Sequence, residues 1–576
     1  MQVPLIAGVE SKKTIALSSD RLYNNFLLFS TSFSLVHATV DGVLVYATAE
    51  LGPLLGGVSG GLLYICYACS SLFLAKNILH QLKARRAVLF GMVCLLTYVS
   101  TFLVALAVPD IKWEVCIFGS IAGGFGAGIM WTAQGSYYAL NSSLYFLASS
   151  NDTDSATEHV TSNKSTILNK FAAYFAGIYL CSEAVCKVLV TGLFLVFSGG
   201  DSDDDDDNND TAGNIGSWQV IAFLVFTLVA WTATACSFWI LDLSTIKHEF
   251  ETEMARASLL KANDFPNMYV KSESDNSSDC TPSISREESC TEITIPTSGM
   301  QLSLIASFSK DFSAVLSFIK DHESFRYLLP YQFAFGFSST YMGFLVYGII
   351  LNDNGKEGYI GLLSALSVLF AGGLTVPVAT YTNRKGGAEG SITTVHAVML
   401  TGAGIFMGCS VFPLFMSEET IASWPVILPL VCTYGAGRSI WENSNKALIA
   451  DLFTTVDAAV DHDIDAGVSI LFRGSMSSIN ECADEEKTPM ESCHERAFAA
   501  IYFTSGVGAA IGFFIFKFLS TNIIAASTLG VGFLALLCNH YIVMESRENK
   551  SKNQSDSAAV VDSGLLDKMI KLSLII

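Results

Sequence analysis

The chain has 576 residues, of which 51% are hydrophobic and 15% are charged, and its mean hydropathy is +0.45. Soluble domains carry about 25% charged residues, so this composition excludes a soluble protein and indicates a protein of the lipid bilayer. The net charge of -20 is concentrated in polar blocks such as DSDDDDDNND at 201–210. The negative charge is therefore a property of the loops, and it excludes nucleic acid as a partner.

Apolar runs long enough to cross a membrane recur along the chain, since a helix needs about 20 apolar residues to span the hydrocarbon core. Before residue 241 we predict spans at about 24–45, 54–76, 88–108, 115–139, 171–197 and 217–240. After residue 323 we predict spans at about 326–350, 358–380, 391–414, 424–449, 496–517 and 521–543. The sequence therefore predicts an all-α membrane protein with twelve transmembrane helices in two groups of six.

Polar stretches separate and flank the two groups. The stretch between them is rich in Ser, Asp and Glu and has too little apolar material to fold alone, so we expect a disordered cytoplasmic loop. The expected organisation is an N-terminus, a six-helix half, the central loop, a second six-helix half and a tail, at 1–23, 24–240, 241–323, 324–543 and 544–576. The second half contains a long polar insertion at 452–494.

Lysine and arginine in the short loops predict the orientation, because cytoplasmic loops carry the excess of these residues. Basic residues follow the second and the eighth span, at Lys76, Lys83, Arg85, Arg86, Arg384 and Lys385. Both termini are therefore expected in the cytoplasm, and the protein is expected in the plasma membrane or an endomembrane.

Asn-x-Ser/Thr sequons give two different indications of orientation. The sequon at Asn209 lies in the acidic loop that the charge rule places outside, so Asn209 is a candidate glycosylation site. Three others, at Asn141, Asn151 and Asn163, lie after the fourth span, where the charge rule predicts cytoplasm. We follow the charge rule, since a three-residue pattern arises easily by chance, and the side on which these three lie stays open.

The fourth span contains AGGFGAGIMWTAQGSYYAL at 122–140, whose glycines fit either a phosphate-binding loop or a close helix contact. A phosphate loop needs a strand before it and a soluble helix after it, whereas these glycines lie within one apolar run of lipid length. Ser120, Gly124 and Gly128 recur every four residues and share one helix face. Small residues on one face predict close approach of another helix backbone.

The tenth span contains TYGAGRSIWENSNKALIADL, which echoes GFGAGIMWTAQGSYYAL of the fourth span. In each, small residues precede a tryptophan, Trp131 or Trp441, and polar residues follow it. Equivalent helices in two six-helix repeats, related by an axis along the membrane normal, are typical of the major facilitator architecture. The sequence therefore predicts that fold.

At this stretch the chain resembles the UNC-93-like (uncoordinated) ion-channel regulatory family, a branch of the major facilitator superfamily. Supporting matches are LYNNFLLFSTSFSLVHAT, LKARRAVLFGMVCLLTY and GAGRSIWEN. The residues that carry the resemblance are Gly124, Gly128, Trp131, Gln134, Gly135, Tyr138 and Trp441. Two features depart from the pattern: QLKARRAV at 81–88 lacks the superfamily's Asp-Arg pair, and the insertion at 452–494 has no counterpart.

Charges within the predicted spans require an explanation, because a charge at mid-bilayer costs roughly 2.5 to 3.5 kcal/mol on insertion scales. Glu183 and Lys187 are four residues apart in the fifth span, so they share a face and can pair. Glu442 and Lys446 repeat that spacing in the tenth span, one turn after Arg438.

Two interpretations of these charges stay open. Either they line a central polar cavity, or they are buried, neutralised pairs that lock helices together. Asp41 lies toward the outer end of the first span, with His37 one turn deeper. Two glutamines within the predicted spans complete the candidates. The candidate cavity residues are Asp41, Gln134, Glu183, Lys187, Gln332, Arg438, Glu442 and Lys446.

The resemblance implies a non-enzymatic protein that regulates or escorts other membrane proteins, potassium channels among them. The expected partners are the lipid bilayer and a channel or receptor in it. The alternative function is a secondary transporter, coupled to protons or another cation, for a small solute. A membrane enzyme would need a catalytic cluster that the sequence does not contain, and no cofactor or metal site is expected.

Overall fold

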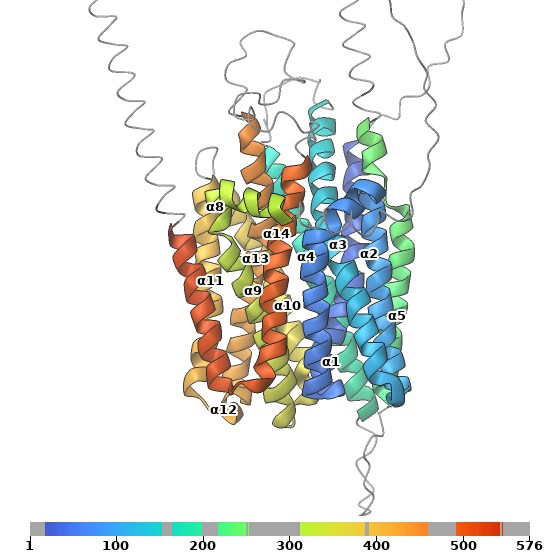
Figure 1. Ribbon diagram of the computed structural model, residues 1–576, viewed down its shortest axis with the longest axis vertical. Coiled ribbons are helices and arrows are strands. Elements are labelled where there is room, and N and C mark those ends of the chain that lie inside the picture. The colour runs from blue at the N-terminus through green and yellow to red at the C-terminus, as the bar shows by residue number, and fades with distance from the viewer. Residues whose placement is uncertain are drawn as a thin grey trace, which may run out of the picture. The chain divides into compact units, whose positions relative to one another are not determined.

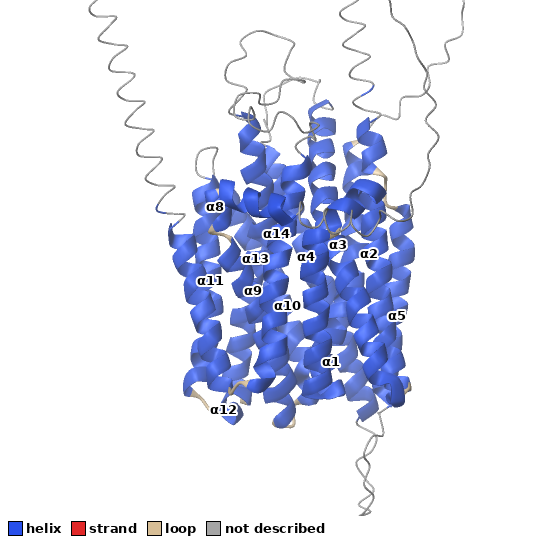
Figure 2. Ribbon diagram, viewed as in Figure 1, coloured by secondary structure: helices blue, strands red, loops and turns tan. Residues whose placement is uncertain are grey.

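The structure is a computed structural model, and it describes residues 18–151, 164–198, 217–248, 252, 312–385, 391–458, 491–541 and 544. Nearly all of these residues are helical, and the described ranges contain no strand (Figure 2). The chain divides into two compact units, one of which is Asp242–Ala314. The other, Met1–Leu241 with Val315–Ile576, contains the helices that build the site (Figure 1).

The first half of the larger unit consists of long helices. They are α1 (Ser19–Phe73), α2 (Ala75–Ala107), α3 (Lys112–Asn151), α4 (Lys164–Ser198) and α5 (Ser217–Cys236), with 3-10 turns at Pro109–Ile111 and Ser237–Trp239. α1 contains the first two predicted spans and departs from helical geometry between them, at Gly52, where φ is 81°. Glycine adopts positive φ without a steric cost, and the following Pro53 cannot donate a helix hydrogen bond, so the first span ends there.

The second half has more short elements. They are α8 (Glu323–Arg326), α9 (Leu329–Thr340), η3 (Tyr341–Leu351), η4 (Glu357–Tyr359), α10 (Ile360–Lys385), α11 (Ser391–Phe415), α12 (Glu418–Ala422), α13 (Trp424–Ala458), α14 (Glu491–Ile515) and η6 (Phe516–Phe518). Residues 521–541 form a further helix. The seventh predicted span runs through α9 into η3, which is a π-helix. Such helices are rare and frequently lie at functional sites.

Nine helical stretches of the described residues are long and apolar enough to cross a membrane. The longest, Ser19–Ala107, has 89 residues and contains the first three predicted spans. α13 covers the tenth predicted span, but it carries Arg438 and Glu442 and is not among these stretches of the described chain. The all-helical, multi-pass membrane fold is confirmed, whereas the count of twelve helices stays a prediction.

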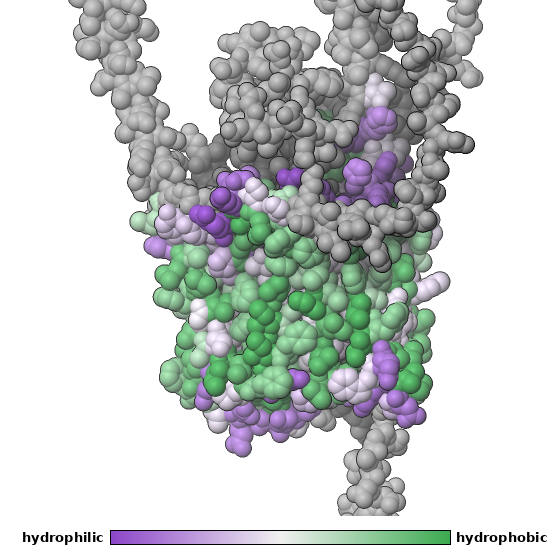
Figure 3. Space-filling model, in the orientation of Figure 1, coloured by the Kyte–Doolittle hydropathy of each residue, from purple (hydrophilic) through white to green (hydrophobic). Residues whose placement is uncertain are grey.

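An apolar belt surrounds these helices. Figure 3 shows hydrophobic side chains over their middle part and hydrophilic ones gathered toward their ends. Large apolar residues point outward on several helices, including Val196, Val376 and Phe415, the last of which is 83% exposed. Outward-facing apolar side chains on long helices are what a surrounding lipid phase stabilises.

Several helices continue beyond their predicted ends. α3 reaches Asn151 rather than 139, α4 begins at Lys164 rather than 171, and the loop expected at 81–88 is helical apart from Lys83. Hydropathy marks only the part of a helix that crosses the hydrocarbon, so the polar turns beyond it were missed. Within the expected central loop, residues 243–248 and 312–321 are helical. The acidic run with Asn209, Asn163, residues 459–490 and both chain ends lie outside the described residues.

The small residues of α3 lie against the second part of α1. Ser120 Oγ is 2.6 Å from Ser59 Oγ, and a Cβ atom added to Gly124 would collide with the backbone oxygen of Leu63. Gly128 is equally close to the backbone of Tyr67. The predicted close approach of two helix backbones is therefore confirmed, and the glycines serve packing rather than phosphate binding.

Replacing Gly124 by alanine tests this contact. The added methyl must displace a backbone, so we expect Gly124→Ala to destabilise the protein by about 1 to 3 kcal/mol, measured as a lower Tm of the purified protein in detergent. Gly177→Ala on α4 is the matched control, because a Cβ there meets nothing within 4 Å. Alanine is the better helix former, so the control should keep or raise the Tm. Equal losses in both variants would contradict the proposed contact.

Candidate functional site

A cavity of about 160 Å³ lies between the two halves of the bundle. Its walls include residues of α1, α3 and α4 on one side and of α9, η3, α10, α13 and α14 on the other. Three carboxylates and two bases are among its described lining residues, at Asp41, Glu183, Glu442, Lys187 and Arg438. The fold thus collects, in one place, charges that are far apart in the sequence.

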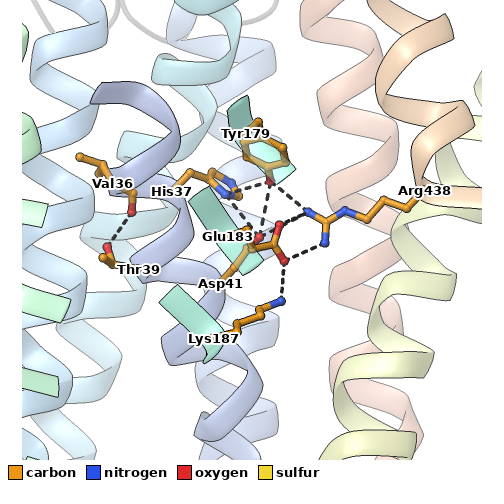
Figure 4. Close-up of polar contacts among 8 residues, drawn as sticks. All are labelled: Val36, His37, Thr39, Asp41, Tyr179, Glu183, Lys187 and Arg438. Carbon is orange, nitrogen blue, oxygen red and sulfur yellow. Dashed lines mark hydrogen bonds and ion pairs between the residues drawn. The ribbon is translucent and has the colours of Figure 1, made fainter. Parts of the chain in front are cut away.

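The strongest contact of the site joins the two halves directly. Arg438 of α13 donates from Nη1 to Glu183 Oε1 at 2.8 Å and from Nη2 to Glu183 Oε2 at 2.5 Å (Figure 4). Both side chains are buried, and Glu183 is fully so. Two parallel hydrogen bonds between guanidinium and carboxylate fix geometry as well as charge. This pair therefore sets how α4 and α13 meet.

The Glu183 carboxylate also serves Lys187, one turn along α4. Lys187 Nζ donates to Glu183 Oε1, and only 4% of the Lys187 side chain is exposed. The pairing predicted from the spacing of these two residues is therefore confirmed. Glu183 is shared between two bases, so removing it would leave both without their main counter-charge.

A second group from α1 and α4 completes the cluster (Figure 4). Asp41 Oδ2 lies 3.5 Å from Arg438 Nη2 and 3.5 Å from His37 Nδ1. The Tyr179 hydroxyl lies 3.0 Å from His37 Nδ1, accepts a hydrogen bond from Arg438 Nη2 at 3.2 Å and donates to Asp41 at 3.4 Å. Two acids and two bases, joined by a phenol and an imidazole, therefore neutralise one another in the apolar interior.

The other predicted cavity residues have different surroundings. Glu442 lines the cavity and is 2% exposed, but Arg438 binds across to α4 instead of pairing along its own helix. Gln332 accepts a hydrogen bond from Trp441 Nε1 at 2.9 Å. Gln134 is fully buried, its amide makes no hydrogen bond to any described residue, and neither glutamine is among the described lining. The side chain of Lys446 lies outside the described part of the chain.

The two tryptophans of the repeated motif occupy equivalent places. Trp131 lies against Phe33, with ring centroids 4.8 Å apart, and Trp441 stacks on Phe335 at 3.7 Å. Phe33 precedes His37 on α1, and Phe335 lies on α9, in the first predicted span of the second half. The repeat seen in the sequence is therefore present as a repeated aromatic contact, and both tryptophans line the cavity.

The other motif residues of α3 tie it to neighbouring helices. The Tyr138 hydroxyl donates to the backbone oxygen of Leu168 on α4. A Cβ added to Gly135 would collide with the Phe498 ring of α14, so Gly135 marks a close contact between the halves. These residues hold the frame around the cavity and do not line it among the described residues.

Asn141, one of the three sequons after the fourth span, lies inside the bundle. Its side chain is fully buried on α3, and Oδ1 accepts a hydrogen bond from Asn25 Nδ2 at 3.3 Å. A glycan needs an exposed acceptor. This sequon therefore gives no evidence that the end of α3 lies outside the cell.

Sequence reasoning missed one residue of the cluster, Tyr179, and one contact, between Glu183 and Arg438. Tyr179 was not singled out, because a tyrosine in an apolar run has no distinguishing pattern. Its position four residues before Glu183, on the same helix face, was the available signal. The 255-residue separation between Glu183 and Arg438 left no local pattern by which to pair them.

A comparison with protein families finds a match for the region that contains the fourth-span motif. Residues 52–157 match the family described as ion channel regulatory protein UNC-93. Over this range the chain is similar to the UNC-93 family. The matched range runs from the Gly52 break of α1 to beyond α3, so it includes the glycine contact and Trp131. This confirms the resemblance inferred from these residues.

Solved structures that the chain is similar to show that it has the major facilitator fold. The proton:xylose symporter XylE, bound to 6-bromo-6-deoxy-D-glucose, is 12% identical, with a TM-score of 0.50, covering 91% of this chain and 95% of that one. A bacterial homologue of the iron transporter ferroportin, outward-facing with soaked iron, is 13% identical, with a TM-score of 0.50, covering 91% and 98%. At such identities the likeness shows the fold alone. No curated protein matched the chain.

A double-mutant cycle measures the bridge between the halves. We expect Glu183→Gln to lower stability by about 3 to 5 kcal/mol, because it strands buried bases, and Arg438→Gln to cost less, because Lys187 still faces Glu183. The double variant should lose less than the sum of the two, since neither side then keeps an unpaired partner. Tm values in detergent report these losses, and exposed Lys170→Gln is the control. Additive losses would show that the two side chains do not interact.

Proposed function

We propose that this UNC-93-like protein regulates or escorts other membrane proteins, potassium channels among them, without enzymatic activity. The observation that carries the proposal is the match of residues 52–157 to a family described as ion channel regulatory. The partners are then the lipid bilayer and a channel or receptor within it, which the apolar outer surface of the bundle suits.

The geometry of the cavity supports the same function. Drug-sized ligands occupy pockets of about 300 to 1,000 Å³, whereas this cavity has about 160 Å³. Lys187 and Arg438 both contact Glu183, so the described bases are committed to protein carboxylates. The cluster therefore suits a bridge between the halves better than a pathway for a large polar solute.

The regulatory function predicts an effect on channel current. Potassium channels expressed in oocytes together with the chain should show altered current or surface abundance compared with the channel alone. The control is co-expression with the proton:xylose symporter, which has the same fold and loads the membrane equally. Unchanged current and abundance across a panel of potassium channels would contradict the regulatory function toward this class.

A second candidate function is a secondary transporter coupled to protons or another cation. The observation in its favour is the presence of Asp41, Glu183 and Glu442 around one cavity. We expect no potassium or proton flux from the wild-type protein in liposomes under an imposed gradient. Flux that Asp41→Asn abolishes, in a sample that remains folded, would replace the regulatory proposal by the transporter. Asp41 suits this test because its side chain is 16% exposed and lies at the edge of the cluster.

We further propose that both termini are cytoplasmic, in the plasma membrane or an endomembrane. The support is the basic group around the Lys83 break, where Lys83 and Arg86 are exposed. An epitope fused to either terminus should bind antibody only after cells are permeabilised, whereas one inserted at 201–210 should bind on intact cells if the protein reaches the surface. Labelling of a terminal epitope on intact cells would reverse the orientation.

A further inference from the structure

Three bases lie together at the break in α2. Lys83 and Arg86 are exposed, and Arg85 is partly buried. Residues 51–109 contain no Asp or Glu, and no described carboxylate forms an ion pair with any of the three bases. This end of α2 therefore carries three positive charges that the described part of the chain does not pair.

The backbone at these bases is strained. Lys83 has a φ of 63° and a ψ of 162°, and no other described residue except glycine has a positive φ. Glycine adopts a positive φ without a steric cost, whereas a side chain makes it unfavourable. Strain of this kind is concentrated at functional sites. The break therefore marks Lys83 as a candidate functional residue.

The turn after α5 lies against the same bases. Arg85 donates from Nη2 to the backbone oxygen of Phe238 at 2.5 Å, and its Nε is buried and donates to no described acceptor. Phe238 and Trp239 are 61% and 72% exposed. Toward their other ends α2 and α5 also touch, where Phe102 stacks on Phe223 with ring centroids 6.3 Å apart. The two helices therefore lie side by side, and Arg85 holds exposed aromatic residues beside the basic segment.

An apolar, outward-facing surface continues from the bases along both helices. Phe90 and Val93 follow Arg86 at four and seven residues, on the same face of α2, and they are 44% and 48% exposed. Leu228 and Trp231 of α5 are 56% and 62% exposed. Exposed tryptophan and arginine at the end of such a surface are typical of the level of the lipid headgroups.

We propose that an anionic phospholipid of the surrounding bilayer binds at this end of α2 and α5, with its headgroup on Lys83, Arg85 and Arg86. Its acyl chains lie along the outward apolar faces of the two helices. Bases next to a membrane attract anionic lipids, and the guanidinium fork matches the oxygens of a phosphate group. A soluble anion or an acidic peptide would use the bases but would leave the adjoining apolar surface to other molecules.

The site requires neither the regulatory function nor a particular orientation of the chain. A lipid added to the purified protein reaches both ends of the bundle. Binding of the lipid without any effect on channel current would keep this site and reject the regulatory function. An effect on current without a preference for the anionic lipid would do the reverse.

The probe is dioleoylphosphatidylserine, titrated onto the purified full-length chain in a neutral detergent, with the bound lipid counted by native mass spectrometry. Dioleoylphosphatidylcholine, which has the same acyl chains and no net charge, is the reference lipid. We expect the first phosphatidylserine to bind at least about tenfold more tightly. The double change Lys83→Gln with Arg86→Gln should remove most of this preference. The matched double change Lys170→Gln with Lys320→Gln, at exposed bases elsewhere, should keep it.

The change Lys83→Gly separates lipid binding from backbone stability. Glycine relieves the strain, so the Tm in detergent should be kept or raised, whereas the preference for phosphatidylserine should fall about fivefold because one base is lost. A purely structural lysine would change the Tm and leave the lipid preference as it was.

Four results would each overturn the proposal. They are equal affinity for the two lipids, an equal loss of preference in the matched double variant, an unchanged preference in folded Lys83→Gly, and displacement of phosphatidylserine by inorganic phosphate at matched ionic strength. The last result would assign the bases to a soluble anion instead of a lipid.

Discussion

The bidentate pair of Arg438 and Glu183 is the interaction on which the rest of the site depends. A carboxylate or guanidinium removed from water costs several kcal/mol, and only a partner with good geometry repays that cost. Neither charge could therefore lie between the halves alone. Once the pair is formed, Lys187, Asp41 and Tyr179 gather around it because each satisfies a remaining donor or acceptor. The cluster holds α1 and α4 of one half against α13 of the other.

The two halves repeat the aromatic contacts of their tryptophans, but the residues that precede these tryptophans differ. The contacts Phe33–Trp131 and Phe335–Trp441 repeat in the two halves. Three residues before each tryptophan, however, the first half has Gly128 and the second has Arg438. Gly128 packs against the backbone of α1, whereas Arg438 reaches across to α4. The same helix position thus serves close packing in one half and a charged contact between halves in the other.

Local patterns predicted what depends on neighbouring residues. Spacing alone gave the Glu183–Lys187 pair and the small-residue face of α3, because both follow from the helical period. Apolar runs of about the length that spans a bilayer predicted the membrane fold. The sequence could not show that Arg438 binds Glu183 rather than remaining beside Glu442, because that choice depends on how the halves pack. The turns of α3 and α4 beyond the predicted spans are polar, so hydropathy does not mark them. The π-helix after α9 lies inside an apolar span, and hydropathy does not distinguish a π-helix from an α-helix there.

The position of the bridge connects the cavity with the state of the whole bundle. Arg438 and Glu183 lie in the cavity wall, so any change in the relative position of α4 and α13 must stretch two short hydrogen bonds that lipid and apolar side chains cannot replace. A ligand shifts such an equilibrium only by binding one arrangement better than the other. A partner in the bilayer that contacts α4 or α13 therefore acts on the bridge only if it binds one arrangement of these two helices better than the other.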